Sequence, residues 1–556
     1  MSEIPVLILR EGTSRSRGRD AQRSNIMAAK VLAETVRSTI GPRGMDKMMV
    51  GGIGDIVVTN DGATIMKEMD VQNPAAKMLV EVAKTQDQEV GDGTTTAVVL
   101  SGELLAGAEG LLDRDVHPNV IIDGYRAAAD KAQEILDDIA VNIKIDDDQQ
   151  LKRVALTSLN TKGIFGSQEH FADLAVKAVK QVMEKSGTKI TADIDMVKVM
   201  KKHGQSLAET ELINGIVIDK EVAHSQMPKK VTGARIALLN AKLEIEKTEM
   251  DAKININKPE EMQLFLDEEE NLLKEMAEQV AASGANVLFS EKGADDEALA
   301  ILAKKGILTV KNVSSGDMEK MAKATGGIIV GTLKDLSKTG LGQAKLVEEV
   351  KIGDDKLVYV REAKNPKAVT IMIRGGSEHV VDEAERSLHD ALCVVRNAVE
   401  DGKIVAGGGA PEAEVSKRLK DYARKAGGRE QLAITAFAEA LEAIPVAIAQ
   451  NAGIDPIDIM VDLRAKHNNA QNKWYGVNVY TGKAEDMWKL NVVEPLRVKK
   501  QVVRSAVEAV TMLLRVDDVI ASKGDKGAGP GAGGPPGMPP GMGGMGGMPP
   551  GMMGGM

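Results

Sequence analysis

Cysteine and aromatic residues are scarce in this sequence. Cys393 is the one cysteine, so no disulfide can form within the chain, which fits a reducing compartment such as the cytoplasm. Phenylalanine, tryptophan and tyrosine together make up 2% of the residues. The cores must therefore be built from alanine, valine, isoleucine, leucine and methionine, and such small side chains suit long, closely packed helices.

An excess of basic charge and long apolar runs are also missing. The formal net charge is -10, whereas a dedicated nucleic-acid binder needs a basic surface to neutralise phosphates. No uninterrupted run of about 18 or more apolar residues occurs, so the sequence predicts no membrane span. Residues 1–10 include acidic Glu3 and no small-residue cleavage pattern follows, so we interpret them as a strand or ordered arm rather than a signal peptide. We expect a soluble, cytoplasmic protein.

Helical periodicity dominates both ends of the chain. A length of 556 residues exceeds what one hydrophobic core usually serves, so several domains are expected. Apolar residues spaced three and four apart predict early helices over 22–40, 73–89, 94–112 and 125–139. The same spacing predicts a helix over 377–400 and a helical region from 407 to about 519. We infer one domain assembled from both ends.

The middle of the chain has a different pattern. Between about 214 and 367, short β-rich runs alternate with helical stretches, which predicts a separate α/β domain. An amphipathic helical insertion begins near 257 within it. The final segment, 524–556, is low-complexity Gly/Pro/Met sequence, and we expect it to be disordered.

Several glycine turns could approach a phosphate, although the sequence has no GxxxxGK[ST] P-loop. Gly91-Asp92-Gly93 directly precedes a predicted helix that opens with three threonines, an arrangement that presents free N–H groups and hydroxyls to an anion. Asp92 would supply a hard oxygen ligand for Mg²⁺. A plain helix start explains the same pattern equally well.

Other candidate positions are individually weak. The segment 39–44 (TIGPRG) could approach a phosphate or simply end a helix. Asn60-Asp61-Gly62 is typical of a hairpin-type turn and would carry a carboxylate at its tip. Gly407-Gly408-Gly409 could contact a nucleotide or act as a hinge.

Asp390 lies in the middle of a predicted helix, beside the apolar stripe of Leu388, Ala391 and Leu392. It is either a solvated edge residue or a positioned base. His389 and Cys393 have no metal-ligand spacing with other histidines or cysteines, so we interpret both as structural.

Taken together, these motifs resemble those of chaperonins. The segments 39–48 (TIGPRGMDKM), 59–65 (TNDGATI), 91–96 (GDGTTT) and 405–412 (VAGGGAPE) occur in the order and spacing of that family. The GPRGMDKM form is similar to the archaeal and eukaryotic group, group II. The insertion at about 243–282 resembles that group's helical protrusion, and the Gly/Met tail resembles those of archaeal thermosome subunits.

The resemblance implies a multidomain fold. It has a mainly α-helical equatorial ATPase domain from both chain ends, an α/β intermediate domain, and an α/β apical domain whose helical protrusion serves as a lid. The implied bounds are equatorial 1–146 and 403–523, intermediate 147–215 and 368–402, apical 216–367, and the tail 524–556.

The resemblance also implies a site for ATP or ADP with Mg²⁺. Asp390 would be the general base or water-positioning residue, Asp61 would lie near the γ-phosphate, and Asp92 would bind the metal. The implied nucleotide contacts are Thr39, Gly41, Pro42, Asp92, Gly93, Thr94, Thr95, Thr96, Lys162, Gly409, Asn478 and Glu494.

By this resemblance the chain is an ATP-hydrolysing subunit of a stacked double ring of identical or paralogous subunits. It would enclose non-native polypeptides without a separate lid co-chaperonin, and without nucleic-acid or membrane partners. A non-enzymatic ring scaffold or holdase that keeps nucleotide as a structural ligand is the alternative. A small-molecule kinase that uses Asp390 as base is a third alternative.

Overall fold

The structure is a computed structural model that describes residues 14–51, 54–164, 166–187, 189–245, 259–363 and 367–521. The expected N-terminal arm, the Gly/Pro/Met tail and residues 246–258 of the insertion lie outside these ranges. The chain divides into two compact units, residues 1–21 with 517–556, and residues 22–516. In the first unit, β1 (Ser14–Arg17) pairs antiparallel with β21 (Asp518–Ala521), and Arg15 forms an ion pair with Asp518.

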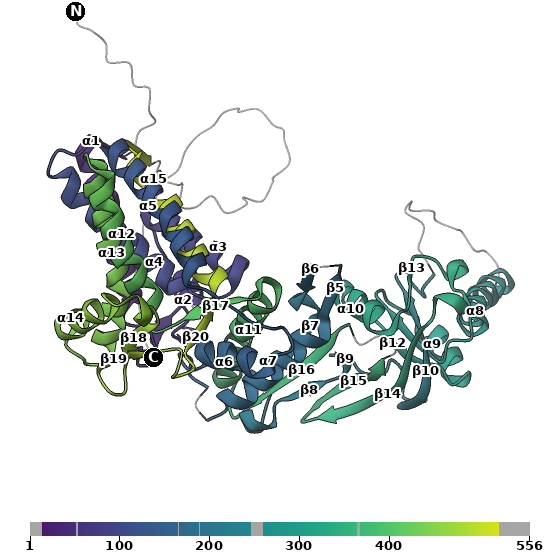
Figure 1. The fold of residues 1–556 in the computed structure, drawn as a ribbon. Helices are drawn as coiled ribbons and strands as arrows, with labels where there is room; N and C mark the ends of the chain where they lie inside the picture. Colours follow the sequence, from purple (N-terminus) through teal and green to yellow (C-terminus); the bar gives the residue numbers. More distant parts are fainter. Residues whose placement is uncertain are drawn as a thin grey trace, which may run out of the picture. The chain divides into compact units, whose positions relative to one another are not determined.

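One hydrophobic core of the second unit contains side chains from both ends of the chain. Figure 1 shows α12 and α13 beside α4 and α5, although about 300 residues of sequence separate them. Small and aliphatic side chains such as Ala33, Leu104, Ala438 and Val510 fill this core, as the scarcity of aromatics predicts. Its helices are α1 (Gly18–Arg37), α3 (Pro74–Val90), α4 (Thr94–Leu112), α5 (Pro118–Ile139), α12 (Ala410–Ala426), α13 (Glu430–Asn451), α14 (Pro456–His467) and α15 (Leu496–Leu514).

Short strands connect several of these helices. The hairpin of β2 (Lys47–Val50) and β3 (Ile56–Thr59) follows α1, and the hairpin of β18 (Tyr475–Asn478) and β19 (Lys483–Asp486) follows α14. A small sheet has the order β20–β17–β4, with bounds Val493–Pro495, Lys403–Ala406 and Val141–Asn142. The region after 407 is therefore not continuously helical.

The middle of the chain forms two further sheets. The smaller has the order β7–β16–β8 (Val197–His203, Val369–Gly375 and Glu211–Ile213). Beside it lie α6 (Asp148–Leu159), α7 (Gln168–Val182) and α11 (Glu378–Asp401), which share one hydrophobic core with its strands. The hairpin of β5 (Met183–Ser186) and β6 (Lys189–Ala192) follows α7.

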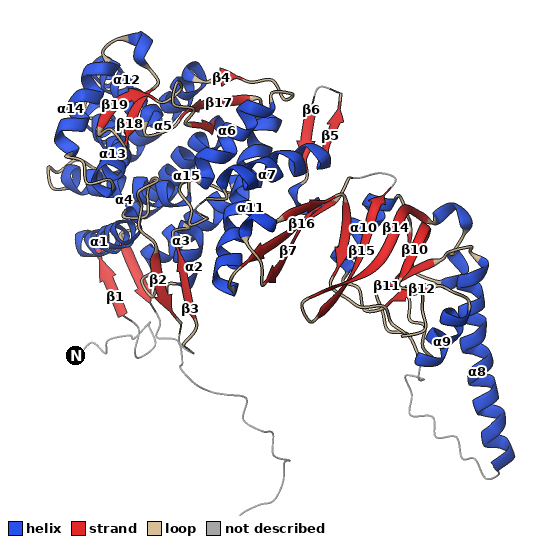
Figure 2. Ribbon diagram, turned by 90° about the horizontal axis from the view of Figure 1, so that it is seen from below, coloured by secondary structure: helices blue, strands red, loops and turns tan. Residues whose placement is uncertain are grey.

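The larger sheet has seven strands in a mixed arrangement. Its order is β12–β11–β10–β14–β15–β9, and β13 also pairs with β10. Strands β10 to β13 run parallel, whereas β14, β15 and β9 form antiparallel pairs. Figure 2 shows α8 and α9 next to this sheet. The bounds are β9 Gly215–Ile218, β10 Lys230–Leu239, β11 Val287–Ser290, β12 Leu308–Val310, β13 Ile329–Val330, β14 Gly342–Ile352, β15 Asp355–Ala363, α8 Pro259–Ala282, α9 Asp296–Lys304 and α10 Ser315–Thr325.

Local capping explains most helix boundaries and corrects one prediction. Asn73 accepts hydrogen bonds from the first backbone N–H groups of α3, as the Asn-Pro pair predicts. The predicted hairpin turn at 60–62 is wrong, because Asp61 caps the short helix α2 (Gly62–Glu68) by accepting from the backbone N–H of Thr64. Asp61 is buried there and does not project from a loop tip.

Two described helices, α4 and α13, are long and apolar enough to cross a membrane by length and composition, although neither is an uninterrupted apolar run. Most of each apolar window is buried within the protein. Both helices belong to the core that the two chain ends share.

Candidate functional site

A cavity of about 570 Å³ opens within the second unit, and we call it the main cavity. Its walls come from α2, α4, α6, α13 and α15, the loops that follow α1 and α6, and the β18–β19 hairpin. It brings together every position predicted to contact a nucleotide. These are Thr39, Gly41, Pro42, Asp92, Gly93, Thr94, Thr95, Thr96, Lys162, Gly409, Asn478 and Glu494.

The N-terminus of α4 faces the main cavity without a side-chain cap. Gly93 precedes the helix with a left-handed backbone (φ 77°) and makes no capping hydrogen bond. The first N–H groups of the 19-residue helix are therefore free for an anion, and the helix dipole favours negative charge at this end. Gly62 makes room here, since a Cβ on it would lie 2.4 Å from Thr95 Oγ1.

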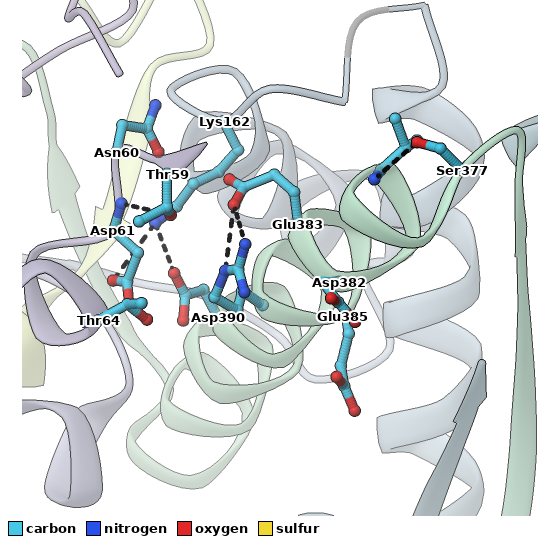
Figure 3. Close-up of polar contacts among 12 residues, drawn as sticks. Thr59, Asn60, Asp61, Thr64, Lys162, Ser377, Asp382, Glu383, Glu385 and Asp390 are labelled. Atoms are coloured by element: carbon cyan, nitrogen blue, oxygen red, sulfur yellow. Dashed lines mark hydrogen bonds and ion pairs between the residues drawn. The ribbon is translucent and has the colours of Figure 1, made fainter. Parts of the chain in front are cut away.

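Three buried charged side chains meet beside the main cavity (Figure 3); Lys162 lines it, whereas Asp61 and Asp390, the two predicted catalytic residues, lie behind Lys162 and outside the lining. Lys162 Nζ lies 2.7 Å from Asp390 Oδ2 and 3.9 Å from Asp61 Oδ1. Lys162 comes from the loop after α6, Asp390 from the middle of α11, and Asp61 from the turn before α2. The interpretation of Asp390 as a solvated edge residue is wrong, because only 5% of its surface is exposed.

The environment shifts the pKa values of these three groups. Burial raises the pKa of Asp390 well above its usual value; the charge of Lys162 opposes this rise, and Asp61 and Asp92 add to it. Burial would also raise the pKa of Asp61, but Lys162 and hydrogen bonds from Thr64 outweigh it and lower that pKa. Burial would lower the pKa of Lys162, yet the three carboxylates outweigh it and raise that pKa. Lys162 is therefore a stable cation.

Oxygen donors suited to a hard cation also line the main cavity. Asp92 lines it, and Oδ1 of this carboxylate accepts from the N–H of Gly93 at 2.6 Å. Asn60 Oδ1 and Ser158 Oγ are buried without a hydrogen-bond partner, and both residues line the cavity. The described residues contain no cluster of three or more acidic, histidine or cysteine ligands. Mg²⁺ fits this donor set, since it takes one or two carboxylates and completes its shell with phosphate oxygens and water.

Part of the main cavity wall is apolar. Ile444, Ile448, Val477 and Val479 line it, and such a surface suits a flat, weakly polar ring. Gly409 permits a close backbone approach, because its φ is 77° and a Cβ there would lie 2.9 Å from Cβ of Pro445.

Two of the predicted nucleotide contacts already have protein partners. Asn478 Nδ2 donates to Glu485 Oε2 at 3.0 Å, and its Oδ1 accepts from the N–H of Tyr480. Glu494 Oε2 lies 2.6 Å from Lys499 Nζ. Burial raises the pKa of Glu494, and Lys499 opposes that rise.

Sequence reasoning missed several residues that shape the site. Lys499 joins Glu494 to Glu412, whose Oε1 lies 2.9 Å away. Asn60 donates its amide to the carbonyl of Thr161 and so ties the turn before α2 to the loop of Lys162. Asn60 stands in the TNDGATI motif and could have been chosen there, whereas nothing in the spacing of Lys499 indicates its partners.

An aromatic pair stands behind one wall of the main cavity. Trp474 and Trp488 stack with ring centroids 5.3 Å apart. Met487, which lines the cavity, donates its N–H to the carbonyl of Trp474. Trp474 also packs on the small cluster of Ala406, Ala410 and Met487, so one ring of the pair lies against a residue of the cavity wall.

Comparisons with known proteins give a consistent result over nearly the whole chain. Residues 32–524 match the model of the TCP-1/cpn60 chaperonin family. The chain is 56% identical over 535 residues to thermosome subunit beta of Archaeoglobus fulgidus, and this alignment covers 96% of this chain and 98% of that protein. It is 57% identical over 518 residues to the thermosome subunit of Methanopyrus kandleri (93% and 95% covered). It is 55% identical over 532 residues to that of Pyrococcus horikoshii (94% and 97%).

Proposed function

The chain belongs to the TCP-1/cpn60 chaperonin family, and from this premise we propose how it works as an ATP-dependent group II chaperonin, with the main cavity as its ATPase site. Its similarity to thermosome subunits, about 55% over nearly the whole chain, supports the chaperonin function and the ATP hydrolysis. The remaining statements concern which residues carry out that function.

The observation that carries this assignment is the placement of Lys162 between Asp390 and Asp61, beside the uncapped start of α4. Phosphoryl transfer to water requires charge neutralisation and an aligned nucleophile more than covalent chemistry. The N–H groups of α4 and the hydroxyls of Thr94, Thr95 and Thr96 bind the phosphates. Lys162 offsets negative charge on the γ-phosphate.

Asp390 positions the attacking water and accepts its proton. A water oxygen bonds to the γ-phosphorus, the bond to the β–γ bridging oxygen breaks, and ADP leaves with that oxygen. The raised pKa of Asp390 suits a group that takes up a proton. Asp61 holds Lys162 and orients water or metal. Asp92 would hold Mg²⁺, which supplies further charge neutralisation on the phosphates when bound.

At the scale of domains, we propose that the shared helical core of both chain ends is the equatorial ATPase domain, over about 1–146 and 403–523. The intermediate domain then covers 147–215 and 368–402, and the apical domain 216–367. The segment 243–282, which includes α8, is the built-in lid. Subunits assemble into a stacked cytoplasmic double ring that encloses non-native polypeptides without a separate lid co-chaperonin, nucleic acid or membrane.

Steady-state phosphate release from the purified protein tests the ATPase assignment. We expect ATP-dependent release that stops when a chelator removes Mg²⁺ and returns when Mg²⁺ is restored. In parallel, the yield of a chemically denatured test enzyme should rise with ATP and remain at background with ADP. A scaffold or holdase would release no phosphate above background, and that result would overturn the proposal.

A further inference from the structure

The C-terminal end of α3 leads directly into the phosphate-binding turn, and another helix caps it. The last carbonyls of a helix have no partners within that helix. Two carbonyls at the end of α3 accept hydrogen bonds from side chains of α11. Arg396 Nη2 donates to the carbonyl of Glu89 at 2.9 Å, and Asn397 Nδ2 donates to the carbonyl of Val90 at 2.8 Å. Gly91, Asp92 and Gly93 follow immediately.

The contact between α11 and this turn is close and buried. Asn397 has no exposed surface, and its Oδ1 accepts from Arg396 Nη2 at 3.4 Å. One turn away, Cys393 packs on Gly91, where a Cβ would lie 2.3 Å from both Cβ and Sγ of the cysteine. The backbone of the turn therefore touches α11 directly, with no space for α11 to slide without losing these contacts.

The residues that make this contact share a helix face with Asp390. Positions 390, 393 and 397 are separated by three and four residues, which places them on one side of α11. Asn397 lies seven residues from Asp390, about 10 Å along the helix axis. The contact between Asn397 and α3 therefore fixes the position of Asp390 along the axis of α11, and so its position relative to Lys162.

We propose that Asn397 is a positioning residue for ATP hydrolysis, which sets the register of α11 on the end of α3 and so the position of Asp390. This inference rests on the proposed function. Asn397 itself touches neither the main cavity nor the carboxylate of Asp390. It acts through the helix. Its loss displaces the base, whereas the phosphate turn keeps the hydrogen bond from Gln86 Nε2 to the carbonyl of Asp92.

A second asparagine makes the same kind of contact from a helix that does not contain the proposed catalytic base, and it can serve as a control. Asn451, the last residue of α13, donates Nδ2 to the carbonyls of Arg37 (3.0 Å) and Ile40 (2.9 Å). It thereby holds the end of α1, which leads into the turn of Gly41 and Pro42. Each asparagine donates to carbonyls at the C-terminal end of a helix, and each of those helices is followed by a turn that lines the main cavity. Only Asn397 lies on the same helix as Asp390.

The test compares Asn397→Leu with Asn451→Leu, since leucine keeps the branched shape and removes the donor without adding charge. Turnover is measured by phosphate release, and nucleotide affinity by calorimetric titration with ADP. We expect Asn397→Leu to lower kcat roughly ten- to a hundredfold, as a displacement of about 1 Å can, with Kd within about threefold of wild type. Asn451→Leu should mainly raise Kd and KM.

A third variant, Asn286→Leu, controls for the general cost of losing such a bond. Asn286 donates to the carbonyl of Gly233 beside β10, outside the main cavity, and should leave kcat and Kd unchanged. A wild-type kcat in Asn397→Leu, or equal losses of kcat and affinity in both anchor variants, would overturn the inference.

If Asn397→Leu does not fold, Arg396→Met removes the neighbouring donor from a half-buried side chain. An unchanged kcat in Arg396→Met would then overturn the inference in the same way.

Failure of this inference is distinguishable from failure of the proposed function. If wild type releases phosphate and Asp390→Ala does not, while Asn397→Leu turns over normally, only the positioning role is lost. If wild type itself releases no phosphate, the proposed function falls first.

Discussion

Asp390 is the side chain whose removal should separate binding from chemistry. Asp390→Ala removes the group that accepts the proton, so we expect phosphate release to fall by about 10²–10⁴-fold. Lys162 keeps Asp61 as a partner at 3.9 Å, so the fold and the affinity for ADP should persist. Phosphate release and calorimetric titration measure the two effects separately.

Asp382→Ala is the control on the same helix. Asp382 pairs with Lys201 at 2.9 Å on a more exposed part of α11, so its loss should change turnover by less than about twofold, as for most surface ion pairs. Wild-type turnover in Asp390→Ala would remove the assigned base.

The pH dependence of kcat should report the pKa of Asp390. The active form is the carboxylate, so turnover should fall as the pH drops through a pKa that burial raises well above that of an ordinary aspartate. Lys162→Met removes the positive charge that opposes this rise. In this variant, the pH below which kcat falls should therefore be higher than in wild type. An unchanged or lower value would contradict the assignment.

At the scale of single residues, motifs predicted the turns of the site better than its charges. Glycine turns indicated position 41, after a predicted helix, and positions 91–93, before one, because a turn that approaches a phosphate closely has few possible sequences. The burial of Asp390 could not be predicted, since it depends on the loop of Lys162, which is more than 200 residues away in the sequence. Lys499 was missed because one of its partners, Glu412, comes from a different helix, α12, and nothing in the local sequence indicates that pairing.

Among the elements, α4 carries two glycines whose replacement should have opposite effects on stability. A Cβ on Gly102 would lie 2.4 Å from Cβ of Ala33 on α1, whereas a Cβ on Gly110 would meet nothing within 4 Å. Gly102→Ala should force α1 and α4 apart and cost about 1–3 kcal/mol. Gly110→Ala should stabilise the helix by up to about 1 kcal/mol.

Thermal unfolding of the two variants measures this difference. The midpoint should fall for Gly102→Ala and rise slightly for Gly110→Ala. Equal shifts would mean that helix propensity, rather than the close approach of α1 and α4, decides the role of glycine in α4.

Helices were more predictable than strands for a physical reason. The caps at Asn73 and Ser377 and the stops at Gly91 and Gly402 are local, so their signal lies within a few residues. Strands β14 and β15 went unpredicted, because charged side chains such as Lys345 and Glu362 occupy their exposed positions and pair across the two strands. The pairing between β14 and β15 stabilises both strands, but it produces no pattern that can be recognised in the sequence of either strand alone.

For the whole molecule, the proposed double ring predicts a particle far larger than one chain of 59.2 kDa. Light scattering should give a mass of many subunits, and negative-stain images should show stacked rings around a central cavity. A monodisperse single chain that still hydrolyses ATP would contradict the assembly while leaving the ATPase site intact.

The joining of the two chain ends in one core was predictable from the sequence at this scale. Both ends show helical periodicity with small apolar side chains, and Ala33 and Val510 indeed belong to one core. The domain bounds stay predictions, because the hydrophobic core around α6, α7 and α11 continues into the larger sheet without a break.

The stacked pair of Trp474 and Trp488 gives the protein a built-in optical probe. The chain contains two tryptophans; they stack on each other, and Trp474 packs beside Met487 of the main cavity wall. Their emission under excitation that spares tyrosine therefore originates beside the proposed ATPase site. Nucleotide binding at that site should change this intrinsic fluorescence, which needs no dye attached to the protein.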